Sequence, residues 1–222
     1  MNYEVEGRDS PWHDELFNTR LACPEIRAAI KRKPSDFLVK EHLCFVPQGS
    51  GEHVYLDVTK VRANTVWVAR EIATFADVRR QDVGYAGRKD RHANTRQWFS
   101  VYLPRSDPKW PDLEIKDVHV HQVVRHKSKL RLGEIQANEF RLVIHFDNEI
   151  EQQRVEARLA KVRSGGFPNY FGPQRFGRGL HNLDRADRML RGGLHQRGDR
   201  GILISAARSW LFNCYLSDRL AL

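Results

Sequence analysis

Among the residues of this chain that could do chemistry, Asp90 stands out because cations surround it. It lies within Gly84-Tyr-Ala-Gly-Arg-Lys-Asp90-Arg-His-Ala-Asn-Thr-Arg-Gln-Trp98, beside Arg88, Lys89, Arg91 and His92. These neighbours favour the ionised carboxylate. A carboxylate repels phosphate, so its place in a basic segment suits a nucleophile or base whose neighbours hold a polyanion. The alternative is an ordinary charged turn, in which Asp90 caps a helix or forms a surface ion pair.

A second basic segment, Arg125-His-Lys-Ser-Lys-Leu-Arg131, carries five cationic or titratable side chains in seven positions. Such a cluster can neutralise several phosphates, and phosphate contacts supply most of the affinity for nucleic acid that does not depend on sequence. The alternative is a solvated surface loop. The candidate RNA-contacting cations in these two segments and before them are Arg79, Arg80, Arg88, Lys89, Arg125, Lys127, Lys129 and Arg131.

Two aromatic features fit either packing or stacking on bases. Phe140 is in phase with Leu142, Ile144 and Phe146 on an expected strand, which favours a core position. It also begins that strand close to the basic cluster, where an aromatic ring could stack on an unpaired base. The segment Pro168-Asn-Tyr-Phe-Gly-Pro-Gln-Arg-Phe-Gly177, with Arg175, suits a nucleic-acid groove or the packing of two domains.

Other chemistries lack their motifs. Gly87-Arg-Lys89 has neither the glycine spacing nor the Gly-Lys-Ser/Thr ending of a phosphate loop, and Gly177-Arg-Gly179 is too short for a dinucleotide fingerprint. The histidines at 119, 121 and 126 have no further ligand at a fixed offset, so we expect no metal. Cys23, Cys44 and Cys214 are scattered, which argues against a disulfide framework or a zinc ribbon.

The composition predicts an ordered, basic, globular protein. The 222 residues are 41% hydrophobic and 29% charged, and the formal net charge is +9. With a pI of about 9.7, polyanions are the expected partners, and nucleic acid comes first. No apolar run is long enough to cross a membrane, and the start at Met1 has no leader-like pattern. We therefore expect a cytoplasmic, reduced protein that acts as a monomer without a cofactor.

Alternation and capping signals predict strands first and helices later. Residues 37–46 and 54–59 are expected to be strands, and the turn composition between them predicts a hairpin. Asn64 or Thr65 is expected to cap a helix, and further strands are expected at 97–103, 118–124 and 140–146. Helices are then expected around Val155–Val162, at 186–191 and at 205–220.

The texture of the sequence changes near residue 165, at Ser164-Gly-Gly-Phe-Pro, which we take as a domain boundary. The apolar pattern of the last helix is still running at Leu222, with no Gly, Asn or Pro to end it. This pattern indicates a chain that stops within an element.

Taken together, these segments resemble the TruD family of tRNA pseudouridine synthases. The resemblance runs in collinear order through Lys31-Arg-Lys-Pro-Ser-Asp-Phe-Leu-Val-Lys-Glu41, Gly51-Glu-His, Asn64-Thr, Gly84–Gln97, Arg125–Gly133, Asn138-Glu-Phe140, Pro168–Gly177 and Ser205-Ala-Ala-Arg-Ser209. It covers nearly the whole chain. One departure is Ala137, where family members usually carry glycine before the asparagine.

The resemblance implies an α+β fold: a pseudouridine synthase catalytic domain with a mixed, mostly antiparallel sheet and flanking helices, into which a more helical TRUD domain is inserted. Residues 1–164 would be the N-terminal portion of the catalytic domain, and 165–222 the incomplete beginning of the inserted domain. By the same resemblance, Asp90 matches the catalytic aspartate and Phe140 the aromatic that packs against the target base. Asn138 matches the asparagine of the same motif, and Lys31 a lysine that pairs with the catalytic carboxylate.

The implied activity is isomerisation of a uridine in tRNA, by resemblance uridine 13, to pseudouridine. This reaction needs neither redox change nor energy input, so the resemblance implies no cofactor or metal. Family members run well beyond this length, so the chain is expected to lack the end of the inserted domain and a final segment of the catalytic sheet. The competing hypothesis is therefore a truncated relative that binds RNA without turning it over.

Overall fold

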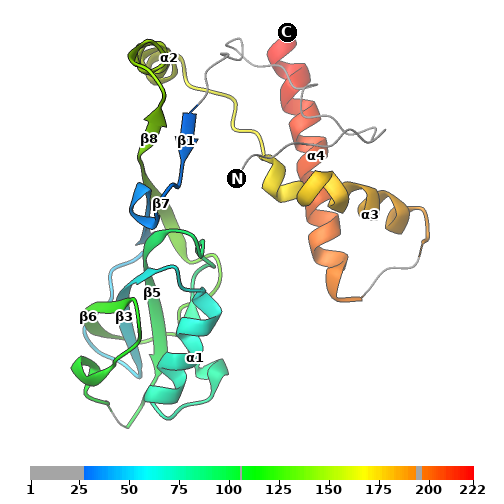
Figure 1. The fold of residues 1–222 in the computed structure, drawn as a ribbon. Coiled ribbons are helices and arrows are strands. Elements are labelled where there is room, and N and C mark those ends of the chain that lie inside the picture. The colour runs from blue at the N-terminus through cyan, green and yellow to red at the C-terminus, as the bar shows by residue number, and fades with distance from the viewer. Residues whose placement is uncertain (1–27, 106, 194–196) are drawn as a thin grey trace. The chain divides into compact units, whose positions relative to one another are not determined.

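The computed structural model describes residues 28–105, 107–193 and 197–222 (Figure 1). Cys23 and the start of the chain from Met1 lie outside the described residues. The contacts divide the chain into two compact units, one of residues 27–149 and the other of residues 1–26 and 150–222. The division falls fifteen residues before the Gly165-Gly166 break at which the sequence texture changes. Each unit is described by itself.

The first unit is built on a six-stranded mixed sheet of described residues. Its strands are β2 Phe37–Leu43, β3 His53–Val61, β4 Val83–Tyr85, β5 Asn94–Tyr102, β6 Val118–His126 and β7 Ile135–Leu142. The order is β6-β3-β5-β2-β7, and β4 also pairs with β5. Only the β2–β5 pair is parallel. The sheet is therefore mixed and mostly antiparallel, and the fold of the described residues is α+β.

The expected hairpin between residues 37–46 and 54–59 is wrong. β5 lies between β2 and β3, because β2 pairs with β5 and β7 instead. The loop that follows β2 is held at β6, where the Gly49 N–H donates to the Arg125 carbonyl at 2.9 Å. Turn composition shows that the chain reverses, but it does not specify which strand will be the neighbour.

The larger hydrophobic cluster of this unit lies on one face of the sheet, under helix α1, Thr65–Phe75. Val54, Leu56 and Val58 alternate along β3 and are all fully buried there, as their spacing predicts. Asn64 caps α1, since its Oδ1 accepts a hydrogen bond from Val66 N–H at 2.8 Å. Figure 1 shows α1 lying against the sheet. This helix leaves its N-terminus beside the loop that carries Asp90.

A single strand over 140–146 is not observed. β7 ends at Leu142, and β8, Ile144–Phe146, pairs instead with β1, Ala28–Ile30, in a separate two-stranded ribbon. At the break, the Val143 N–H donates to the Asp36 carbonyl at 2.8 Å rather than to a ladder partner. The alternation of apolar residues continues across Val143, so this two-residue period could not predict where β7 ends and β8 begins.

The second unit is helical among its described residues. Its helices are α2 Glu149–Gly165, which begins at the division, α3 His181–Leu190 and α4 Arg200–Ala221. Phe176, Leu183, Ala206 and Trp210 form the core between the loop after α2, α3 and α4. All three helices were expected, although each is longer than its sequence signal. Among the described residues, none of the helices combines the length and apolarity that crossing a membrane requires.

Candidate active site around Asp90

Asp90 lies on the loop between β4 and β5, with its carboxylate half exposed. Lys31, which follows β1, donates from its Nζ to Asp90 Oδ2 at 2.7 Å. Lys31 has a φ of 59°, a left-handed conformation that is unusual for a non-glycine residue. Two residues separated by 59 positions thus meet as an ion pair at the end of the sheet. The geometry leaves a carboxylate that solvent or a ligand can reach.

Aromatic rings line the same place. The Lys31 Nζ lies 3.9 Å from the centroid of the Phe37 ring, and the centroids of Phe37 and Phe140 are 6.0 Å apart. Phe140 lies opposite Val39 in the β2–β7 register. The core position that periodicity alone favours for Phe140 is wrong, because this residue is 58% exposed, and its role as the aromatic that packs on a base stays a prediction. An exposed ring of this kind, beside the Phe37 ring that the Lys31 ammonium contacts, can stack on a planar ligand.

Asn138 is on the same face of β7 as Phe140, because residues two apart on a strand point the same way. It lies opposite Glu41 of β2. Its Oδ1 is buried, and among the described residues no donor reaches it. A buried acceptor without a partner is costly, so this atom is suited to a donor supplied from outside the described chain.

A buried polar network lies beneath the loop. Thr65, the first residue of α1, accepts from the Lys89 N–H at 3.0 Å and donates to Gln97 Oε1 at 2.9 Å. Gln97 in turn donates to the Gly87 carbonyl at 3.2 Å. These bonds fix the main chain on the N-terminal side of Asp90. The sequence pattern did not predict that Thr65 and Gln97 hold this loop. The residues around a glutamine in a strand do not indicate which distant group it will bond to.

Lys89 does not point to solvent as an RNA contact would require. Its ammonium forms an ion pair with Glu41, whose side chain is fully buried, and only 6% of the Lys89 side chain is exposed. Glu41 also accepts from the Trp98 N–H at 3.1 Å. We correct the expectation for Lys89 accordingly: it anchors the loop to β2 and is unavailable to phosphate. In the sequence, a lysine next to arginines and an aspartate has the same pattern whether it contacts phosphate or forms a buried ion pair.

Lys60, near the end of β3, is the other buried cation at this loop. Its Nζ donates to the Ala63 carbonyl at 2.7 Å and to the Asp90 carbonyl at 3.4 Å. Burial and repulsion from Lys89 lower the pKa of Lys60 to about 8, although the Asp90 carboxylate opposes the shift. Nothing in the sequence pattern of β3 distinguishes this lysine from an exposed one.

The pKa of Lys60 predicts an unusual alkaline dependence of stability. Between pH 8 and 10.5, the unfolded chain keeps a proton that folded Lys60 has released, so the free energy of unfolding should rise with pH across this window. The rise should total about 3 kcal/mol. We expect Lys60→Met to remove it, measured as the difference between the two urea-denaturation series at each pH. Tyr55, whose pKa burial raises, opposes the rise near pH 10 in both proteins, so it cancels in the difference. Identical pH dependence in the two proteins would contradict the prediction.

The basic segment after β6 lies next to the start of the loop. Gly133 N–H donates to the Ala86 carbonyl at 2.8 Å, and Leu130 N–H to Ser100 Oγ at 2.9 Å. A Cβ at Gly84 would lie 2.3 Å from the Leu130 carbonyl oxygen, so only glycine permits this approach. The structure therefore brings the segment around Lys127–Arg131 alongside β4 and the loop of Asp90.

The predicted RNA-contacting cations differ in how free they are. Arg88, Lys127 and Arg131 are exposed. Others are engaged: Arg79 pairs with Asp82, Arg80 donates to the Val83 carbonyl, Lys129 donates to the Gln81 carbonyl, and Arg125 bonds to Asp107 and to the Leu103 carbonyl. The engaged residues brace loops of this unit. Arg79 is exposed as well, but it pairs with Asp82, so Arg88, Lys127 and Arg131 are the best candidates for phosphate contacts.

Arg175 belongs to the second unit. Its guanidinium lies 5.1 Å from the centroid of Phe171, and its Nη1 donates to Ser205 Oγ at 3.4 Å. Asn213 of α4 holds the loop of Phe171 by two bonds of 2.9 Å to its main-chain N–H and carbonyl. Within this unit, the segment 168–177 therefore packs on α4, and its Arg175 guanidinium stacks on the Phe171 ring.

The three histidines that were candidates for metal ligands, His119, His121 and His126, make different contacts in the structure. The rings of His119 and His121 meet edge to face at 4.6 Å, and Thr59 bonds to His121. His126 stacks on Phe45 at 4.8 Å. Among the described residues, no group of three potential ligands gathers in a way that could hold a metal ion.

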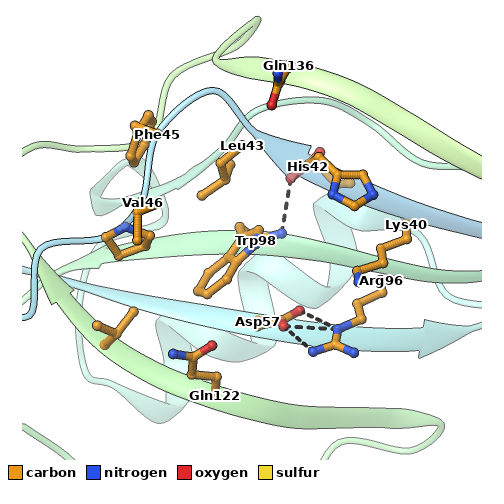
Figure 2. Close-up of a pocket in the computed structure, with 13 residues that line it drawn as sticks. Lys40, His42, Leu43, Phe45, Val46, Asp57, Arg96, Trp98, Gln122 and Gln136 are labelled. Carbon is orange, nitrogen blue, oxygen red and sulfur yellow. Dashed lines mark hydrogen bonds and ion pairs between the residues drawn. The ribbon is translucent and has the colours of Figure 1, made fainter.

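The pocket drawn in Figure 2 is on the other face of the sheet. It measures about 370 Å³ and is lined by side chains that include Lys40, His42 and Trp98. Lys40 and His42 flank Glu41 on β2, so their side chains point away from the Asp90 side. The ion pair of Asp57 and Arg96 borders it, with Arg96 Nε 2.9 Å from Asp57 Oδ2 (Figure 2). Asp90 is not among the residues that line this pocket.

Comparison with known proteins shows the family to which the chain is similar. Residues 17–196 match the family model described as tRNA pseudouridine synthase D (TruD). A tRNA pseudouridine synthase D from Nitrosococcus oceani is 49% identical over 201 residues, covering 88% of this chain and 56% of the relative. The enzyme of that name from Methylococcus capsulatus is 44% identical over 216 residues, covering 95% of this chain and 60% of the relative.

A solved structure is similar as well. A crystal structure from Methanosarcina mazei, described as a tRNA pseudouridine synthase D, has a TM-score of 0.64 and 25% identity, covering 73% of this chain and 38% of that one. The fold and the matches thus define an RNA-modification protein class, the pseudouridine synthases. The chain belongs to the TruD family. It spans 56% to 60% of the length of the curated relatives named here.

Proposed function

We propose that this chain carries the catalytic aspartate of a tRNA pseudouridine synthase, and that Asp90 is that residue. The observation that carries the proposal is the half-exposed Asp90 carboxylate, paired with Lys31 at 2.7 Å beside the Phe37 and Phe140 rings. A solvent-accessible carboxylate held by a cation at a surface with stacking rings suits attack on a flipped nucleotide.

In the proposed reaction, the bond between C1′ and N1 of uridine breaks, the base turns, and a bond forms between C1′ and C5. C5 loses its proton and N1 gains one, so the reaction is a balanced isomerisation without a redox partner. Asp90 acts as nucleophile or base at the sugar or the base. Lys31 orients the carboxylate, and Phe140 stacks on the extruded uracil. Asn138 Oδ1, the buried acceptor without a described partner, accepts a hydrogen bond from the uracil.

The proposed substrate is tRNA, and the proposed position is uridine 13. Extruding a base costs a few kcal/mol, which stacking and phosphate contacts must offset. Arg88, Lys127 and Arg131 are exposed, and none pairs with a carboxylate among the described residues. We assign the sequence-independent grip on the tRNA backbone to these three side chains. Arg175, in the second unit, would contact RNA from what we propose is the beginning of an inserted domain, residues 165–222.

The competing function is RNA binding without turnover. It is favoured by one observation: the chain spans only 56% to 60% of its relatives' length, so groups outside it could be needed for catalysis. The two functions share the basic surface and differ only in what Asp90 does.

The test is pseudouridine formation by this chain on unmodified tRNA transcripts that carry tritium at C5 of uridine, quantified as tritium released to water without added metal or nucleotide. We expect product at uridine 13 that accumulates with time. A second transcript with cytidine at that position should give no product, which checks the position independently of the activity. Absence of product together with intact tRNA binding would reject the synthase proposal for this chain and favour the binding protein.

A further inference from the structure

Lys60 is the most completely buried cation among the described residues, and its partners are main-chain carbonyls. The side chain is 0% exposed, and among the described residues it forms no ion pair. Lysines are rarely buried in full unless they are paired, because the ammonium loses its hydration. The neighbouring core residues of β3 on this face, Leu56 and Val58, are apolar. Burying the Lys60 ammonium here is therefore unfavourable unless nearby groups compensate for the lost hydration.

The two carbonyls that Lys60 holds come from different segments. Ala63 precedes the cap of α1, and Asp90 lies 30 residues from Lys60 on the β4–β5 loop. The other main-chain anchors of this loop leave Asp90 itself untouched: Gln97 holds the Gly87 carbonyl, Thr65 holds the Lys89 N–H, and the Arg62 N–H donates to the Ala93 carbonyl at 3.2 Å. Lys60 thus provides the described main-chain contact at the residue that carries the carboxylate.

The position of the charge matters as well as the hydrogen bonds. Asp90 is held through its carboxylate by Lys31 at the surface and through its carbonyl by Lys60 from the interior. The charged groups that act on Lys60 are Lys89, which repels it, and Asp90, which attracts it. A cation fixed in a low-dielectric interior stabilises a nearby carboxylate more strongly than an exposed one does.

We propose that Lys60 is a positioning residue for Asp90: from the interior it fixes the Asp90 main chain and places a positive charge beneath its carboxylate. This inference rests on the proposed function of Asp90. Lys60 touches neither substrate nor reacting atoms in this role; it acts by restricting where the carboxylate can point. Its loss should therefore reduce turnover and leave tRNA binding nearly unchanged.

The test compares Lys60→Met with the unmodified chain, and Lys116→Met, which replaces an exposed lysine, serves as the matched control. We expect Lys60→Met to lower kcat by about 10- to 100-fold with less than a twofold change in KM and in the Kd for tRNA. Lys116→Met should change none of these values. Lys60→Gln, which keeps an N–H donor without the charge, should recover part of the loss, and it carries the test if Lys60→Met does not fold.

A readout independent of activity is hydrogen exchange measured by mass spectrometry. In Lys60→Met, we expect faster exchange over residues 86–93 and unchanged exchange over α1. Unchanged kcat together with unchanged exchange would overturn the proposal. Exchange that becomes faster to the same extent in α1 and in the loop would also overturn it, because this result would indicate general destabilisation. If the unmodified chain forms no pseudouridine, the proposed function fails on its own account, whereas the exchange experiment still decides whether Lys60 fixes the loop.

Discussion

Asp90→Asn is expected to lower the rate of pseudouridine formation by roughly 10³-fold or more, because an amide can serve neither as nucleophile nor as base. The amide is isosteric and retains an oxygen that can accept the hydrogen bond from Lys31, which is 2.7 Å away in the native pair. The loop should therefore keep its conformation. Removing a negative charge from the proposed RNA-binding surface should leave the affinity for tRNA equal or slightly higher.

The measurement is single-turnover kinetics with enzyme in excess, together with filter binding of the same tRNA. Asp107→Asn is the matched control, since Asp107 is exposed to a similar extent, 48% against 44%, and also pairs with a cation, Arg125. Its rate should stay within about twofold of the unmodified chain. If Asp90→Asn keeps a tenth or more of the native rate, Asp90 is not the catalytic carboxylate.

Glu41→Gln is expected to cost the first unit about 3–5 kcal/mol of stability, because it leaves the ammonium of Lys89 buried without its counter-charge. The side chain of Glu41 is fully buried, so water cannot take over its role. The same substitution disturbs the bond from the Trp98 N–H. Because Lys89 directly precedes Asp90, we also expect the loop to become more mobile.

Native-state hydrogen exchange at amides of β3 and β5 measures this effect within the unit of residues 27–149. The double variant Glu41→Leu with Lys89→Met removes both charges and should recover most of the loss. Asp82→Asn, which breaks the exposed pair with Arg79, should cost less than about 1 kcal/mol. A cost of that size for Glu41→Gln as well would show that the buried pair contributes no more than a surface pair.

Much of the local structure could be predicted from the sequence. The buried face of β3 and the cap of α1 at Asn64 follow from spacing and residue type. The candidate site was predicted in part: the resemblance to the TruD family pairs Lys31 with Asp90, and the structure places those two side chains 2.7 Å apart. The catalytic roles of these residues stay predictions, which the experiments above address.

The sequence by itself determined most of the local elements, the net positive charge and the family, because alternation, capping and motifs depend on residues close together in the chain. Only the tertiary structure decided that β5 separates β2 from β3, that Phe140 is exposed, and that Lys89 and Lys60 are buried. Each of these outcomes depends on which distant segment becomes the neighbour. A lysine in a basic run has the same local pattern whether its ammonium meets water, a phosphate or a buried glutamate, so its role is set by packing.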